Sequence, residues 1–256
     1  MTFTILGFCP RSGKMGFAQS TSTPAVGWRC TDVVLGRGVV SVQAHADYRQ
    51  LQLAKRHMAS GLKPSQVMKA LAENDPFFAY RQIAILGLDG EAAVVSGAKA
   101  YPWAGEVTGP DHIATGNVLV GPAVVQAMSD AYVGNADIDF EDRLMVALEA
   151  GRDAGGQPDG QTSAAIVVYE KYEFPIVNLR VDVSLEPVAE LRRIFDWFKP
   201  LISYYVERTL DPGSVPRYKV VLAEKNLPLI PYAYCQAWPV APHRRAIRSE
   251  NVFQIR

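Results

Sequence analysis

The feature of this chain that most constrains its fold is the order in which two hydrophobic periods follow each other. Short apolar or alternating stretches typical of strands come in pairs, and stretches with helical spacing of apolar residues follow them. A doubly wound parallel sheet needs strands and helices to alternate singly, so paired strands around paired helices instead predict an α+β fold of two antiparallel sheets with helices stacked outside. The expected strands are 2–8, 14–20, 39–43, 82–86, 92–96, 113–120, 164–169 and 176–181, and the expected helices are 48–58, 64–71, 122–128, 140–148 and 187–198.

Turn residues support these boundaries. Asp89-Gly90 separates two apolar runs and predicts a hairpin, because both central residues of the favoured turn need a positive φ. Gly151 closes the fourth expected helix. Pro200 is expected to break or kink the last one, since proline removes a backbone donor and clashes with the preceding turn.

The amino-acid composition of the chain changes beyond Asp211. Prolines recur through the last stretch together with Tyr232, Tyr234 and Trp238, whose rings favour burial. We therefore expect one domain over 1–210 and an extended segment over 211–256 that packs on the domain or on a partner subunit. A homo-oligomer is expected on this ground.

Composition excludes several classes of protein. The 256 residues include 26 lysines and arginines against 26 aspartates and glutamates, which argues against a nucleic-acid partner. No apolar run approaches the roughly 18 residues that span a bilayer, and no signal peptide is visible, so a cytoplasmic protein without a membrane partner is expected. Cys9, Cys30 and Cys235 form no C-x-x-C pair, and neither a metal nor a cofactor is expected.

The most informative position is Thr2, directly after the initiator methionine. Threonine is small enough for that methionine to be removed, which leaves a hydroxyl nucleophile and a free α-amine on one residue. An α-amine titrates at about 7.7–8.0, so much of it can be neutral and can accept the hydroxyl proton. Met1 must be removed for this chemistry, because a retained methionine holds the nitrogen of Thr2 in a peptide bond.

A series of short motifs lies in order over roughly residues 2–198. The motifs include Thr2-Phe3-Thr4-Ile5, Ser12 to Ala18, Ala25-Val26-Gly27, Gly38-Val39-Val40, Gln43-Ala44, Arg81-Gln82, Trp103-Ala104-Gly105, Gly116-Asn117, Ala154-Gly155-Gly156, Leu179 to Asp182 and Glu190 to Arg193. Through these motifs the chain resembles an uncharacterised bacterial family placed among the N-terminal-nucleophile hydrolase-like proteins, the domain of unknown function numbered 1028. The resemblance implies a four-layer α-β-β-α sandwich.

This chain also departs from the family pattern. Residues 156–163 read Gly-Gln-Pro-Asp-Gly-Gln-Thr-Ser where the family has Gly-Gly-Asp, Arg-Gly and Gln-Ser. Val183 and Ser184 replace an acidic residue and a histidine, and Thr21 replaces a common lysine. Losing several polar side chains in one region predicts an altered or absent substrate site.

The leading hypothesis is a small-molecule amide or imide hydrolase in which Thr2 attacks the carbonyl. Asn117 is the candidate amide donor of an oxyanion hole. Gln43, His45 and Arg81 are candidates to orient the substrate, with Asp47 beside His45. Each also has a structural interpretation: Gln43 can satisfy backbone groups, His45 can cap, and Arg81 can pair with an acid.

Two alternatives stay open. The changed polar segment and the tail are also typical of a non-catalytic binding or assembly module on the same scaffold. A hydrolase that uses Ser20 or Ser22 as nucleophile with His45 is a further possibility, and it would not need removal of the methionine.

Overall fold

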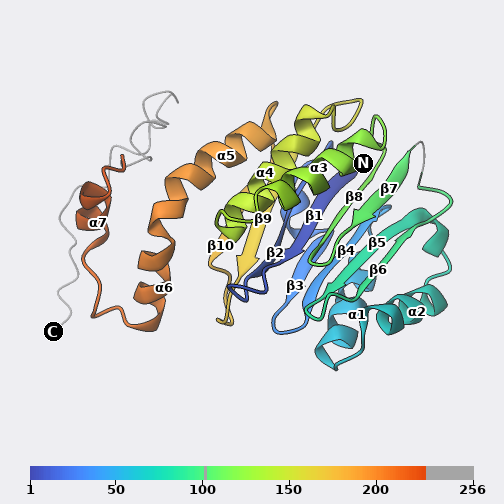
Figure 1. Cartoon of the computed structure of the whole chain (residues 1–256), viewed down its shortest axis with the longest axis horizontal. Coiled ribbons are helices and arrows are strands. Elements are labelled where there is room, and N and C mark those ends of the chain that lie inside the picture. The colour runs from blue at the N-terminus through green and yellow to red at the C-terminus, as the bar shows by residue number, and fades with distance from the viewer. Residues whose placement is uncertain (101–102, 229–256) are drawn as a thin grey trace, which may run out of the picture. The chain divides into compact units, whose positions relative to one another are not determined.

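The computed structural model describes residues 1–100 and 103–228. Contacts divide the chain into two units, Met1–Ile202 and Ser203–Arg256. The first unit holds two antiparallel sheets that lie face to face between two layers of helices, as Figure 1 shows. The predicted four-layer α-β-β-α sandwich is thereby confirmed.

One sheet has six strands in the order β10-β9-β2-β1-β8-β7, and every pair in it is antiparallel. The first strand of the chain, β1, therefore lies near the middle, between β2 and β8. Its strands are β1 (Thr2–Phe8), β2 (Met15–Thr21), β7 (Ala104–Thr108), β8 (His112–Asn117), β9 (Ser163–Tyr169) and β10 (Val177–Val181).

The other sheet has four strands in the order β3-β4-β5-β6. They are β3 (Thr31–Val34), β4 (Gly38–Ala44), β5 (Arg81–Gly87) and β6 (Ala92–Ser96). The hairpin expected at Asp89-Gly90 joins β5 to β6, and Gly90 has the positive φ of 82° that the turn needs.

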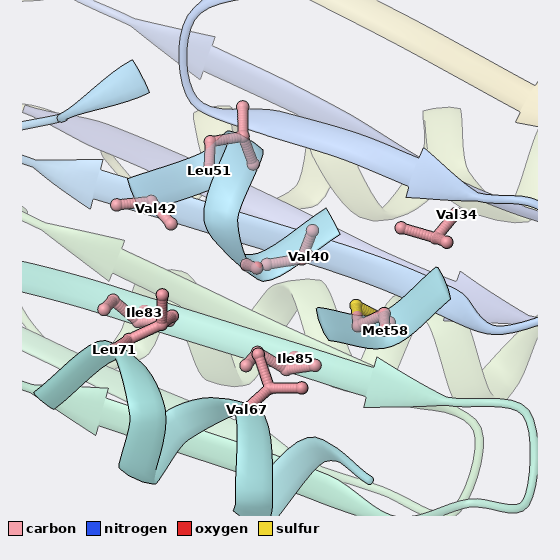
Figure 2. Close-up of a cluster of buried hydrophobic side chains, with 10 residues drawn as sticks. Val34, Val40, Val42, Leu51, Met58, Val67, Leu71, Ile83 and Ile85 are labelled. Atoms are coloured by element: carbon pink, nitrogen blue, oxygen red, sulfur yellow. The ribbon is translucent and has the colours of Figure 1, made fainter. Parts of the chain in front are cut away.

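Helices cover the outer face of each sheet. The six-stranded sheet packs against α3 (Ala123–Gly134), α4 (Phe140–Asp153) and α5 (Pro187–Phe198). The four-stranded sheet packs against α1 (Tyr48–Ala59) and α2 (Pro64–Asn74). Figure 2 shows the apolar layer on that side, where Val40, Val42 and Ile85 of the strands meet Leu51 of α1 and Leu71 of α2.

The side chains between the two sheets change from apolar to polar along the strands. Leu6, Phe17, Val39 and Leu86 form an apolar cluster toward one end. Because side chains two residues apart share a face, the same face toward the other end carries polar groups. These buried polar residues are Thr2, Thr4, Gln19, Thr21, Ser41, Gln43, Gln82, Thr115 and Asn117.

Most expected elements are found, with differences that have local causes. Strands β3 and β7 were not expected: β3 has only four residues, and β7 is an edge strand of mixed polarity. The strand expected over 113–120 ends at Asn117, because Val118 takes a left-handed φ of 54° that cannot continue a ladder. Beyond α5, a 3-10 turn over Lys199–Leu201 includes Pro200, so the predicted break is confirmed.

The second unit contains two short helices in its described part. They are α6 (Ile202–Leu210), whose first residue still belongs to the first unit, and α7 (Tyr218–Glu224). Residues 211–228 are therefore not wholly extended, in contrast to the expectation for this segment, because α7 buries Val221 and Leu222. The expected packing of the tail depends on three aromatic residues that lie outside the described residues, namely Tyr232, Tyr234 and Trp238. The extent of the domain and the packing of the tail stay predictions.

Among the helices of residues 1–100 and 103–228, none is both long enough and apolar enough to cross a membrane.

Candidate functional site

Thr2 begins the strand at the middle of the larger sheet. Its partners in the ladder are Thr21 on β2 and Asn117 on β8, directly opposite on either side. Opposite side chains in an antiparallel pair have Cβ atoms about 5 Å apart, so these three polar side chains form one group. Each of them is less than 5% exposed.

The hydroxyl groups of Thr2 and Thr21 are 3.2 Å apart. The Thr21 hydroxyl donates its hydrogen to the carbonyl oxygen of Met1. Since a hydroxyl has a single hydrogen, the Thr2 hydroxyl must be the donor in the bond to Thr21. With Met1 in place, the Thr2 Oγ1 proton therefore points to Thr21.

The amino terminus lies in a partly buried environment. Burial lowers the pKa of the Met1 α-amine below its ordinary value; Cys30 opposes this lowering, while Arg29 adds to it. Burial also raises the pKa of the Cys30 thiol to about 11, so this thiol is neutral near pH 7. An amine in such surroundings is more easily deprotonated than a solvated one.

Met1 lines a cavity of 260 Å³ at this end of the sheets. That volume lies just below the range of about 300–1,000 Å³ typical of small-molecule sites. The lining residues are Met1, Ala44, His45, Lys99, Ala100, Asn117 and Val118.

The backbone of this cavity is strained at two positions. Ala44 and Val118 have φ values of 70° and 54°, a left-handed conformation that costs free energy for residues with a Cβ and most of all for a β-branched residue. Ala44 is the last residue of β4, and Val118 directly follows β8. Strain of this kind gathers at functional sites, where the surrounding structure holds it.

A buried amide network fixes the orientation of Asn117. Gln82 Nε2 lies 2.8 Å from the carbonyl of Gly116 and 3.2 Å from that of Gly105, and carbonyls only accept. Gln82 Oε1 therefore faces Asn117 Nδ2, at 2.9 Å, and also accepts from Gln43 Nε2 at 2.8 Å. As a result Asn117 Nδ2 is directed to Gln82, and Asn117 Oδ1 is buried without a hydrogen-bond partner in the described part of the chain.

Gln43 and His45 lie at the end of β4 in different surroundings. Gln43 is fully buried, accepts from Thr4 Oγ1 at 2.8 Å, and donates to Gln82 Oε1 at 2.8 Å. The ring of His45 is exposed, lines the cavity and packs edge-on against Tyr80, with ring centroids 5.4 Å apart. Of the two, only His45 borders the cavity.

Arg81 and Asp47 are held together beneath this end of the sheet. Arg81 Nε lies 2.8 Å from Asp75 Oδ2, and its guanidinium also donates to the carbonyl of His45 and approaches Asp47 at 3.5 Å. Asp47 caps α1 by accepting from the backbone N–H of Arg49. The hydrogen bond from the Arg49 side chain holds the pKa of Asp47 below its usual value. Arg81 thus holds the backbone carbonyl of His45, while Asp47 caps α1 and pairs with Arg49. Their predicted roles in substrate binding stay predictions.

Ser20 and Ser22, the candidate nucleophiles of the serine-based alternative, have different surroundings. Ser20 faces away from Gln19 and Thr21 on β2, is fully buried, and donates to the carbonyl of Ser163 at 2.9 Å. Ser22 Oγ is buried without a partner. No hydrogen bond joins either serine to His45 in the part of the chain that the structure describes.

Several residues at the site were not predicted from the sequence to belong to it. Thr21 was noted only as a departure from the family, and Gln82 only as part of a motif. Lys99, which lines the cavity, stands in a loop without a motif. Gln157, in the departing segment, is 3% exposed and has neither side-chain polar atom bonded. Its segment is tied to the site, because Thr162 N donates to the carbonyl of Thr21 at 2.7 Å.

Within the described ranges, no group of three histidine, cysteine, aspartate or glutamate side chains is placed to hold a metal ion. Cys9 and Cys30 are free thiols, and Cys235 lies outside the described residues.

Two antiparallel sheets lie face to face between helix layers, and the second residue of the chain begins a central strand. The protein is therefore a four-layer α-β-β-α sandwich, the fold that the family resemblance implies. This chain belongs to a family of unknown function, DUF1028, whose family model matches residues 2–191. The crystal structure of protein SPO2555 from Silicibacter pomeroyi, of the same family model, is 32% identical, with 77% of this chain and 89% of that chain covered and a TM-score of 0.72.

More distant likenesses are eukaryotic HslV from Trypanosoma brucei and Anbu, the ancestral beta-subunit, from Yersinia bercovieri. The first is 12% identical over 65% of this chain and 99% of that chain, with a TM-score of 0.42. The second is 8% identical over 80% and 97%, with a TM-score of 0.38. At that distance neither bears on the activity of this chain. No curated protein matches it.

Proposed function

We propose that this protein is an amide or imide hydrolase of small molecules whose nucleophile is the hydroxyl of Thr2. The observation that carries the proposal is the place of Met1, which lines the cavity next to the strand partner of Thr2, Asn117. Removal of Met1 opens this cavity directly onto the nitrogen of Thr2. The nucleophile, its built-in base and room for a ligand then lie together.

The first half of the reaction forms an ester on Thr2. The α-amine of Thr2 takes the hydroxyl proton as Oγ1 attacks the carbonyl carbon, which gives a tetrahedral intermediate. The intermediate then collapses, the C–N bond breaks, and the leaving nitrogen takes the proton from the ammonium group. In the second half, the neutral amine removes a proton from water, the hydroxide attacks the ester, and Thr2 Oγ1 leaves with that proton.

Removal of Met1 also changes the hydrogen bonds of the nucleophile. Thr21 loses the carbonyl to which it donates, so its hydroxyl becomes free to accept from the new α-amine or to donate to Thr2 Oγ1. We propose that Thr21 positions the amine and the hydroxyl of Thr2 for proton transfer. The proposed oxyanion-hole role of Asn117 would use its second Nδ2 hydrogen, because the first goes to Gln82.

One observation favours the rival function, a non-catalytic binding module. The Met1 carbonyl has a defined partner in Thr21, so a retained methionine is accommodated at the site. The serine-based alternative has less support, because the Ser20 hydroxyl is engaged by a backbone carbonyl on the other face of β2.

Two measurements test the proposal. Intact mass of the purified protein is expected to lack one methionine residue. Multiple turnovers on a panel of aliphatic amides and cyclic imides, followed by ammonia release or ring opening, are expected with Thr2 and with Thr2→Ser. Thr2→Ala, which still permits methionine removal, is expected to be inactive. Retention of Met1, or equal turnover by Thr2→Ala, contradicts the proposal.

A further inference from the structure

The cavity at the amino terminus presents two unlike binding groups. Asn117 Oδ1 is a hydrogen-bond acceptor on a fully buried side chain of a residue that lines the cavity, and it has no partner among residues 1–100 and 103–228. An acceptor left unpaired in this way is destabilising, so a ligand that donates to it gains binding free energy. The bonds of Gln82 to backbone carbonyls prevent Asn117 from turning its amide to relieve this cost.

The second group is the ammonium of Lys99 at the exposed side of the cavity. Lys99 Nζ lies 3.1 Å from the hydroxyl of Tyr80 and 4.5 Å from the centre of its ring, which hold the ammonium in place without neutralising it. No carboxylate forms an ion pair with Lys99 among residues 1–100 and 103–228. The acids of this region, Asp47 and Asp75, are bound to arginines instead.

We infer that the ligand of this cavity is a small amide- or imide-type molecule that carries a carboxylate or a similar anion. Its N–H donates to Asn117 Oδ1, and its anionic group lies at Lys99, with the ring of His45 as a further hydrogen-bonding group beside it. The cavity has 260 Å³ while Met1 still lines it, so a molecule with a few carbon atoms between the two ends fits the space that removal of Met1 enlarges. The inference rests on the proposed function only where it takes an amide or imide as the bond that is attacked. The binding of the ligand at Asn117 and Lys99 does not depend on that reaction.

Binding is tested separately from catalysis. The protein is produced from a cleavable fusion so that residue 2 is the first residue, and it carries Thr2→Ala so that no probe is consumed. The probes are malonamate, succinamate and glutaramate, each paired with its neutral methyl ester. Dissociation constants are measured by ligand-observed NMR at low and high salt.

At least one carboxylate is expected to bind about fivefold or more tightly than its ester, the ratio that one partly exposed ion pair supplies. Lys99→Gln is expected to remove the difference, and Lys69→Gln, an exposed lysine on α2, to preserve it. High salt is expected to reduce the preference. The N,N-dimethyl amide of the best probe, which lacks an N–H, is expected to bind more weakly than the parent.

Equal binding of every carboxylate and its ester, or a preference that survives Lys99→Gln, overturns the inference, as does the absence of binding by all probes. The proposed function fails in a different way. If the carboxylate preference is found but the protein with an intact Thr2 turns over none of the probes, the binding inference stands and the hydrolase does not. Turnover without a preference for the anion gives the opposite result.

Discussion

The hydroxyl of Thr2 lies 3.2 Å from the hydroxyl of Thr21, across the antiparallel pair formed by the first two strands. Thr21 in turn donates to the carbonyl of Met1, so one short chain of hydrogen bonds links the first residue, the proposed nucleophile and the neighbouring strand. This arrangement makes Thr21 the most direct means of testing the site.

Replacing Thr21 by valine, which keeps the shape and removes the hydroxyl, is expected to lower kcat of the processed enzyme about fivefold. One hydrogen bond contributes about 1 kcal/mol, and about 1.4 kcal/mol corresponds to a factor of ten in rate. Steady-state kinetics of Thr21→Val and Thr21→Ser make the comparison, with the serine variant expected to retain most of the rate. Thr108→Val, on the exposed edge strand β7, is the matched control. A full rate in Thr21→Val would exclude the positioning role.

The α-amine base predicts the pH dependence of the reaction. The amine acts only when it is neutral, so kcat/KM is expected to fall tenfold per pH unit below the pKa of the amine. An ordinary α-amine has a pKa of about 7.7–8.0, and burial at this site acts to lower it, as it does for Met1. The midpoint of the acid limb is therefore expected below about pH 7.7. A pH–rate profile that is flat from pH 5 to 8 would rule out the amine as the base.

Gln82 connects the two sheets beneath the cavity, and its loss is expected to be costly. Gln82→Met leaves the carbonyl of Gly116 and the amides of Gln43 and Asn117 without their partner in a buried space. The free energy of unfolding is expected to fall by about 3 kcal/mol. Urea denaturation measures it, and Gln126→Met on the exposed side of α3 is expected to change it by less than about 0.5 kcal/mol. Comparable losses in both variants would show that the network is not a main source of stability.

In the apolar layer between the smaller sheet and its helices, the loss of stability on truncating a side chain is expected to depend on how deeply that side chain is buried. Leu71 of α2 is fully buried against Ile83 and its neighbours (Figure 2), so Leu71→Ala is expected to lower the free energy of unfolding by about 3 kcal/mol. Leu185 has 95% of its surface exposed, and Leu185→Ala is expected to cost less than about 0.5 kcal/mol. Thermal or urea denaturation of the two variants gives the comparison; a tolerated Leu71→Ala would contradict the packing of α2.

The predictable part of the site was the strand that carries it. Thr2 stands at a position whose chemistry depends on the chain order alone, and Asn117 ends an apolar strand. Thr21, Gln82 and Lys99 could not be assigned in this way, because they reach the site from three other segments of the chain. Arg81 shows the reverse: its charge suggested substrate binding, whereas the fold gives it Asp75 and the backbone of His45 as partners.

The sequence by itself determined the layers of this protein, because hydrophobic periods of two and of 3.6 residues specify strands and helices locally and their order excludes a parallel sheet. It also placed a threonine where removal of one methionine creates a nucleophile with its own base. The tertiary structure alone decided which polar residues surround that threonine, and that Asn117, which lines the cavity, has a buried oxygen without a hydrogen-bond partner in the described part of the chain. Such facts depend on strand register and on hydrogen bonds between segments far apart in the chain, which no local pattern encodes.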